Sequence, residues 1–222
     1  MSETILVTGA SAGFGQAICR RLVADGYRVI GSARRIDKLH ALQEELGEAF
    51  YPLQMDVTDL SQVDHALASL PKAWERVDVL VNNAGLALGL APAYEAEVAD
   101  WLTMIQTNIV GLTYLTRKIL PQMVERNDGY IINLGSTAGT VPYPGANVYG
   151  ASKAFVKQFS LNLRADLAGK KIRVSNIEPG LCEGTEFSSV RFKGDEKRVE
   201  ALYRDAHAIQ PEDIANTVAW LI

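Results

Sequence analysis

The feature that most constrains the fold of this chain is a regular alternation of short, apolar, β-branched runs with amphipathic stretches. The amphipathic stretches carry apolar residues at helical spacing, as at Ile36, Leu39, Leu42 and Leu46. A chain that repeats strand and helix in this way forms a parallel sheet covered by helices, so we predict an α/β fold with a doubly wound parallel sheet. The predicted strands are residues 5–8, 27–32, 50–54, 77–81, 130–134 and 172–177.

The organisation along the chain indicates one domain. With 222 residues, of which 48% are apolar, the chain can bury a substantial core, and we find no repeat, linker or low-complexity tract. We therefore predict a single domain over residues 1–222, with long helices over 98–126 and 148–167 flanking the centre of the sheet. Segment 184–207 lacks a clean period and is predicted to be a flap or short helices on the substrate side, and its charged run 193–198 to be a solvated face.

Composition excludes several classes of function. The net charge of -4 provides no general basic field for nucleic acid. No apolar stretch approaches the roughly 20 residues that span a bilayer, and no secretory leader is present, so we expect a soluble, cytoplasmic protein with no membrane partner. Cys19 and Cys182 are too few and too far apart for a disulfide framework, and they share no ligand spacing with a histidine, so we predict no metal site. Cys19 should pack as a small apolar residue, while the reactivity of Cys182 stays open.

Three glycines follow the first predicted strand and precede a helix. A strand-to-helix turn presents backbone N–H groups and the positive end of the helix to a pyrophosphate, and glycine permits close approach of the ligand. Three glycines alone are a modest signal, and the alternative is a tight turn that binds nothing. We predict a dinucleotide-binding loop made of Gly9, Ser11, Ala12, Gly13, Phe14 and Gly15.

A tyrosine and a lysine stand four residues apart at the start of the 148–167 helix. Tyr149 and Lys153 therefore project from one face of the helix. An ammonium beside a phenol favours the phenolate, so we expect Lys153 to lower the pKa of Tyr149 from its reference value of about 10 toward the working range. Taken singly, a tyrosine, serine or asparagine is more often a packing or capping residue.

Two further motifs follow the glycine turn, and the order of all the motifs along the chain resembles that of a known family. Asn82-Asn83-Ala84-Gly85 follows the 77–81 strand, and Ser136 precedes Tyr149 by thirteen residues. Together with the glycine turn and Tyr-x3-Lys, these motifs resemble the short-chain dehydrogenase/reductase family over the whole chain. The resemblance implies a Rossmann-like sheet of order 3-2-1-4-5-6, with a seventh strand beyond Ile222. It also implies a homotetramer built partly on the long helices, where Phe155, Phe159 and Leu163 could supply apolar surface or could equally pack on the sheet.

The resemblance assigns roles to residues of this chain. Tyr149 is then the proton donor and acceptor, and Lys153 also binds the nicotinamide ribose. Ser136 donates to the substrate oxygen, and Asn108 holds a water that links the lysine to solvent. Further implied cofactor contacts are Asp56 and Val57 at the adenine, and Asn83, Ala84, Gly85, Pro179, Gly180, Thr185, Glu186 and Phe187 elsewhere along the dinucleotide.

Two arginines indicate which nicotinamide cofactor binds. NAD-using Rossmann domains carry an acid at the end of the second strand, where its carboxylate binds the ribose hydroxyls and repels a 2′-phosphate. Here Arg34 and Arg35 follow that strand without an acid, and guanidinium groups suit phosphate, so we predict NADP(H). The alternative is that both arginines simply begin a solvated helix. Ala12 stands where some NADP-using relatives carry a basic residue, so selectivity would rest on the two arginines alone.

The substrate is expected to be a small molecule bound among Ser136, Thr137, Tyr143, Tyr149, Leu181 and the flap. Segments 133–139 and 184–194 resemble bacterial NADP-dependent 3-hydroxy acid dehydrogenases, which act on serine, allo-threonine and short 3-hydroxy acids and reduce malonic semialdehyde. An anionic substrate needs a partner, and Arg191 is the candidate clamp; alternatively, Arg191 is a surface arginine that stacks or pairs with Glu186 or Asp195.

Other functions remain open at this stage. Closely similar reductases convert sulfoacetaldehyde to isethionate, and the same clamp would serve a sulfonate. The pair Cys182-Glu183 departs from the resemblance and could change this choice. A non-catalytic NADP-sensing protein on the same fold would ordinarily lose the tyrosine or the lysine, and a reductase of large apolar substrates would need a less charged flap.

Overall fold

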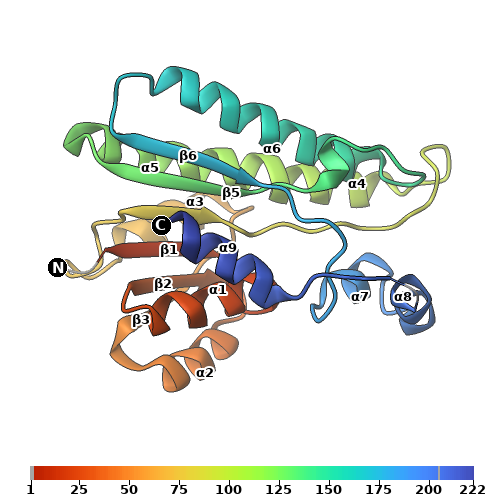
Figure 1. Cartoon of the computed structure of the whole chain (residues 1–222), viewed down its shortest axis with the longest axis horizontal. Coiled ribbons are helices and arrows are strands. Elements are labelled where there is room, and N and C mark those ends of the chain that lie inside the picture. Colours follow the sequence, from red (N-terminus) through yellow and green to blue (C-terminus); the bar gives the residue numbers. More distant parts are fainter. Residues whose placement is uncertain (1–2, 205) are drawn as a thin grey trace.

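The computed structural model of the chain describes residues 3–204 and 206–222, so Asp205, within the predicted flap, lies outside the described residues. Within these ranges the strands form one parallel sheet of order β3-β2-β1-β4-β5-β6 (Figure 1). This order confirms the predicted fold class. The predicted strand ends hold to within two residues, the widest difference being at β4. The strands are β1 Thr4–Thr8, β2 Arg28–Ala33, β3 Phe50–Gln54, β4 Val79–Asn82, β5 Gly129–Leu134 and β6 Ile172–Ile177.

Helices cover both faces of the sheet because successive side chains of each buried strand point to opposite sides. Ile5 and Val7 of β1 enter one core, and Leu6 between them enters the other. The first core is closed by α1 (Gly13–Ala24), α2 (Ile36–Leu46) and α9 (Pro211–Leu221). The second core is closed by α3 (Leu60–Ala68), α5 (Leu112–Arg126) and α6 (Asn147–Asp166). Cys19 of α1 is fully buried in the first core, as predicted.

The site-forming end of the sheet is set by its topology. From β1 the chain winds to β2 and β3, and it then returns to β4 on the other side of β1. The chain therefore leaves β1 and β4 in opposite directions along the sheet, and open α/β sheets bind their ligands at the carboxyl edge at such a point. The short helices α7 (Phe187–Arg191) and α8 (Glu196–Tyr203) lie beyond this edge (Figure 1) and confirm short helices in the predicted flap.

The long helix predicted over 98–126 is present but is not uniformly α-helical. It begins as α4 (Val98–Ile105), widens into a π-helical segment over Gln106–Gly111, and continues as α5. The wide segment contains Asn108, and π segments inside α-helices are frequent at functional sites. It also brings the helix close to the loop after β3, since a Cβ on Gly111 would lie 2.7 Å from the carbonyl oxygen of Val57.

The remaining predicted helices also form. Helix α6 matches the predicted 148–167 stretch to within one residue, and Pro211 occupies the first turn of α9 in a capping box of Gln210 and Asp213. On α6, Leu163 packs into the second core, while Phe155 is 38% exposed and stacks on Phe159 at 5.8 Å. A homotetramer stays a prediction. No helix in the described ranges combines the length and apolar character needed to cross a bilayer.

Candidate active site

A cavity of about 730 Å³ opens at the carboxyl edge of the sheet, between the strand ends and the flap. It brings together almost all of the predicted site residues. Gly15 and Asn108 are buried behind the wall of the cavity. The predicted residues that line it are Gly9, Ser11, Ala12, Gly13, Phe14, Arg34, Arg35, Asp56, Val57, Asn83, Ala84, Gly85, Ser136, Thr137, Tyr143, Tyr149, Lys153, Pro179, Gly180, Leu181, Thr185, Glu186, Phe187 and Arg191.

The glycine turn between β1 and α1 has the shape of a cradle. Gly9 has a φ of +68°, and a Cβ on Gly15 would lie 2.2 Å from the Gly9 carbonyl oxygen, so neither position suits a side chain. Asn83 ties the turn to the loop after β4, because its Nδ2 donates to the carbonyl oxygen of Thr8 at 2.7 Å. Ala12 offers no side-chain cap to the backbone N–H groups that begin α1. These features fit the pyrophosphate of a dinucleotide.

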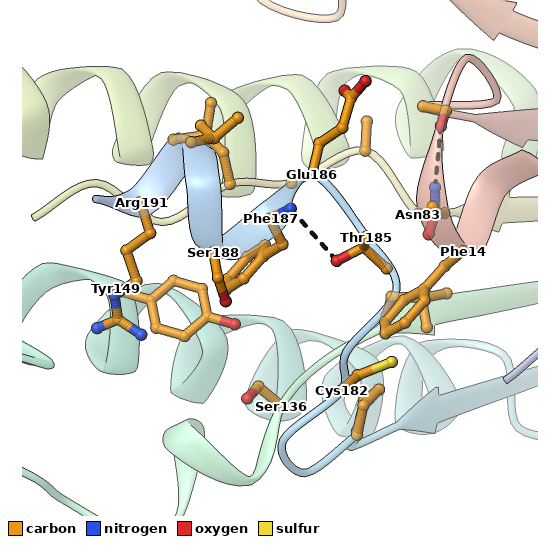
Figure 2. A pocket seen from close by; sticks show the side chains of 18 of the residues that line it. Phe14, Asn83, Ser136, Tyr149, Cys182, Thr185, Glu186, Phe187, Ser188 and Arg191 are labelled. Atoms are coloured by element: carbon orange, nitrogen blue, oxygen red, sulfur yellow. Dashed lines mark hydrogen bonds between the residues drawn. The ribbon is translucent and has the colours of Figure 1, made fainter. Parts of the chain in front are cut away.

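Tyr149 and Lys153 lie one turn apart on the face of α6 that borders the cavity, and both are buried. The hydroxyl of Tyr149 points into the cavity on the side of Ser136 (Figure 2). Lys153 Nζ donates to the carbonyl oxygen of Leu134 at 2.8 Å and lies 5.9 Å from the centre of the Tyr149 ring.

The prediction that Lys153 lowers the pKa of Tyr149 is wrong for this structure. Burial raises the pKa of Tyr149, while the neighbouring hydroxyl of Ser136 acts in the opposite direction, and Lys153 is not among the groups that lower it. Burial also lowers the pKa of Lys153 to about 8. Both groups are withdrawn from water, and desolvation is the largest cause of the pKa shift of each.

Asn108 holds the loop that follows β4. Its Oδ1 accepts from the backbone N–H of Leu86 at 2.9 Å, and its Nδ2 donates to the Leu86 carbonyl at 2.9 Å and to Ser152 Oγ at 3.0 Å. A Cβ on Gly85 would lie 3.3 Å from both Asn108 Oδ1 and Lys153 Nζ, so both groups pack against Gly85. The part of Asn108 in a proton relay stays a prediction.

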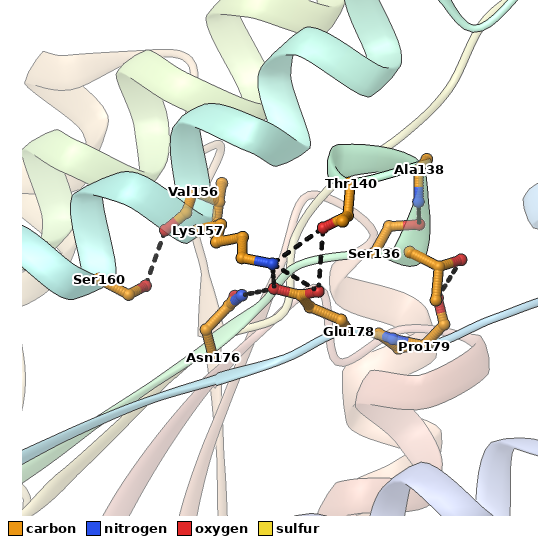
Figure 3. Close-up of polar contacts among 10 residues, drawn as sticks. Ser136, Ala138, Thr140, Val156, Lys157, Ser160, Asn176, Glu178 and Pro179 are labelled. Carbon is orange, nitrogen blue, oxygen red and sulfur yellow. Dashed lines mark hydrogen bonds and ion pairs between the residues drawn. The ribbon is translucent and has the colours of Figure 1, made fainter. Parts of the chain in front are cut away.

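A polar brace fixes the turn that carries Ser136 (Figure 3). Glu178 accepts from Lys157 Nζ on α6 at 3.3 Å and from Asn176 Nδ2 at 2.9 Å. Lys157 Nζ also donates to Thr140 Oγ1 at 2.9 Å, at the end of the 3-10 turn Thr137–Gly139. The brace joins α6, this turn and the end of β6. It therefore links the helix that carries Tyr149 to the turn that carries Ser136.

Arg35 is engaged by the flap, a contact that the sequence did not predict. Its Nη2 donates to Glu186 Oε2 at 2.8 Å, and its Nε and Nη2 lie 3.3 and 3.2 Å from Ser11 Oγ. The contact joins the end of β2 to the start of α7. Arg34 is exposed and makes no ion pair within the described residues.

Arg191 is only 9% exposed, so the alternative of a surface arginine paired with Glu186 or Asp195 is wrong. Its Nε donates to the carbonyl oxygen of Gly89 at 3.2 Å, and its guanidinium carbon lies 5.4 Å from the ring centre of Tyr149. Its Nη2 is buried with no hydrogen-bond partner among the described residues. A buried guanidinium with an unused donor beside the Tyr149 ring can take an anion (Figure 2).

Sequence reasoning missed two polar residues of the flap that line the cavity, Ser188 and Tyr203. Tyr203 donates to the Cys182 carbonyl at 2.7 Å and lies 2.6 Å from Ser188 Oγ. Burial raises the pKa of the Cys182 thiol to about 12, so Cys182 is not a thiolate at neutral pH. Across residues 3–204 and 206–222, no three His, Cys, Asp or Glu side chains gather where they could hold a metal.

Known proteins resemble this chain over nearly its full length. The model of the short chain dehydrogenase family matches residues 3–196. A probable NADP-dependent dehydrogenase of Haemophilus influenzae is 61% identical, over 99% of this chain and 87% of the relative. The NADP-dependent 3-hydroxy acid dehydrogenase YdfG of Salmonella typhi is 58% identical, over 98% of this chain and 88% of the relative. Among solved structures, the closed form of a serine dehydrogenase complexed with NADP+ superposes with a TM-score of 0.96 at 57% identity, over 98% of this chain and 88% of that one.

Proposed function

The chain belongs to the short-chain dehydrogenase family, and from that premise we propose that it is an NADP(H)-dependent oxidoreductase acting on the 3-hydroxyl group of a small anionic hydroxy acid, serine among them. The buried, partly unpartnered guanidinium of Arg191 beside Tyr149 is the observation that carries the substrate class. The relatives named for NADP-dependent chemistry support the cofactor and the reaction type.

The residues of the cavity fit NADP(H). The glycine turn and the start of α1 would hold the pyrophosphate, and Asp56 and Val57 would border the adenine. Arg34 and Arg35 would hold the 2′-phosphate, and Thr185 and Phe187 of the flap would border the nicotinamide. When bound, the nicotinamide supplies or accepts the hydride.

Tyr149 handles the proton at the substrate oxygen. During carbonyl reduction its hydroxyl donates a proton to that oxygen, and during alcohol oxidation it takes one up. A pKa raised by burial keeps the phenol protonated at neutral pH, which suits the reductive direction. Ser136 Oγ accepts from the backbone N–H of Ala138 at 3.1 Å, so its own O–H is available to donate to the substrate oxygen.

The remaining polar groups orient substrate and cofactor. Lys153, held by the Leu134 carbonyl, places its Nζ 5.9 Å from the centre of the Tyr149 ring, where it would bind the nicotinamide ribose. Arg191, whose guanidinium carbon lies 5.4 Å from the centre of the Tyr149 ring, would bind the carboxylate of the substrate, because its Nε is fixed by Gly89 and its Nη2 has no partner among the described residues. The hydroxyl or carbonyl of the substrate would then lie between Tyr149 and Ser136.

The test is a panel of NADPH oxidation assays with malonic semialdehyde, sulfoacetaldehyde and propanal, run beside NADP-linked oxidation of serine. We expect malonic semialdehyde to be reduced with a much higher kcat/KM than the neutral propanal. Preference for sulfoacetaldehyde would favour the alternative of an isethionate-forming reductase, for which Arg191 would clamp a sulfonate. Equal rates with propanal would contradict an anionic substrate, and NADPH binding without turnover of any substrate would favour the sensing alternative.

A further inference from the structure

The guanidinium that should receive the cofactor phosphate already has an anionic partner. Arg35 donates to both carboxylate oxygens of Glu186, at 2.8 and 3.2 Å, and it is steadied by Ser11 Oγ. Glu186 stands 151 residues away in the sequence, at the start of α7 in the flap. Both side chains are about half exposed and both line the cavity, so a ligand can reach the pair.

A phosphate dianion placed on Arg35 would stand beside the Glu186 carboxylate. Hydrogen bonding from Arg35 holds the pKa of Glu186 below its ordinary value, so this carboxylate is charged at neutral pH. Two anions sharing one guanidinium repel each other, and the carboxylate must give way for the phosphate to bind Arg35 in bidentate fashion. Arg34, which makes no ion pair within the described ranges, has no such competitor.

We propose that Glu186 is a specificity-determining residue that competes with the 2′-phosphate of the cofactor for Arg35. Binding of NADP(H) then requires the flap to release Arg35, whereas NAD(H), which has a hydroxyl at that position, leaves the pair intact. The inference rests on the proposed function, because it takes Arg35 as a ligand of the 2′-phosphate.

The other contacts of the flap beside the cavity do not depend on the ion pair between Glu186 and Arg35. Thr185 approaches the glycine turn, since a Cβ on Gly13 would lie 3.2 Å from its side chain, and Phe187 faces Tyr149 at 5.8 Å between ring centres (Figure 2). The backbone N–H of Phe187 is held by Thr185 Oγ1 at 3.2 Å. Loss of the Glu186 contact therefore changes the charge at Arg35 and leaves the contacts of the flap beside the nicotinamide position.

Replacement of the carboxylate by an amide tests the competition. Glu186→Gln keeps the shape of the side chain and removes its charge, so we expect the Kd for NADPH to fall about two- to fivefold, the range of a half-exposed ion pair. The Kd for NADH should stay unchanged. Both are measured by fluorescence titration of the reduced dinucleotides. Glu183→Gln is the matched control, because this carboxylate just before the flap accepts from Gln210 Nε2 at 2.6 Å and does not line the cavity.

A second variant background separates the proposal from a general effect on the flap. In Arg35→Ala, the further change Glu186→Gln should no longer tighten NADPH binding. The proposal is overturned if Glu186→Gln weakens NADPH and NADH alike, if it leaves the Kd for NADPH unchanged, or if the gain persists without Arg35. If wild-type protein binds neither dinucleotide, the proposed function itself fails, and this inference fails with it.

Discussion

Replacement of Arg191 by methionine tests the substrate class through a single buried cation. Methionine retains a long, unbranched side chain but removes the charge and all five N–H donors. The fold should tolerate the change, because α7 keeps the backbone hydrogen bond from Gly89 N–H to the Arg191 carbonyl at 2.9 Å. The side-chain bond from Arg191 Nε to the Gly89 carbonyl is lost in the same step.

The magnitude follows from the unused donor on Arg191. A hydrogen bond to a charged group contributes about 1.5–3 kcal/mol, and each 1.4 kcal/mol corresponds to a tenfold change. If the Nη2 donor holds the substrate carboxylate, kcat/KM for malonic semialdehyde should fall about 10- to 150-fold in Arg191→Met. Propanal, which has no charge to lose, should be reduced with a kcat/KM within about threefold of wild type.

The assay is the decrease in NADPH absorbance with each aldehyde, together with a thermal melt of each variant. Lys193→Met is the matched control, because Lys193 is a flap cation that is 58% exposed and pairs with Asp100 at 2.8 Å, outside the cavity. It should leave both values of kcat/KM near wild type. If kcat/KM falls equally for both aldehydes in Arg191→Met, the role of Arg191 is structural only. If kcat/KM for malonic semialdehyde is unchanged, Arg191 does not bind the substrate carboxylate.

Three further predictions concern the cofactor site. Arg34→Glu combined with Arg35→Ala should raise the Kd for NADPH far more than that for NADH, and equal losses would refute the assignment of the phosphate site. Gly15→Ala should destabilise the fold by about 1–3 kcal/mol in urea unfolding, because its Cβ meets a backbone carbonyl oxygen at 2.2 Å, whereas Gly180→Ala, with open space around its Cβ, should not. Burial lowers the Lys153 pKa from 10.5 to about 8, so between pH 8 and 10.5 the unfolded chain binds more protons than the folded chain. Burial of the ammonium therefore lowers the free energy of unfolding by its full amount below pH 8 and by less as the pH rises above 8. From pH 7 to 9.5, wild type should therefore gain about 2 kcal/mol in free energy of unfolding relative to Lys153→Met, and a loss would contradict the burial argument.

The sequence predicted the sheet because strand and helix periods are local properties. The runs at 50–54 and 172–177 form β3 and β6 with the same ends, and Tyr149 and Lys153 share a face because helical geometry requires it. The strand order and most cofactor residues followed from the family resemblance, and the order and the cavity lining agree with it.

The features that escaped prediction depend on contacts between distant segments. Arg35 and Glu186 are 151 residues apart, and no local period links them. Arg191 is buried because the loop at Gly89 packs against α7. The charged residues around Arg191 in the sequence gave no indication of this contact. The raised pKa of Tyr149 reflects desolvation by the surrounding structure, a quantity that helical spacing alone does not contain.

The most direct test of the account is the turnover of Tyr149→Phe, measured beside its affinity for NADPH. The substitution removes one hydroxyl from a buried ring, so the fold and the dinucleotide site should persist and the Kd for NADPH should stay within about twofold of wild type. Loss of the proton donor should lower kcat for malonic semialdehyde by at least about 10²-fold. Turnover at the wild-type rate with phenylalanine at this position would contradict the account.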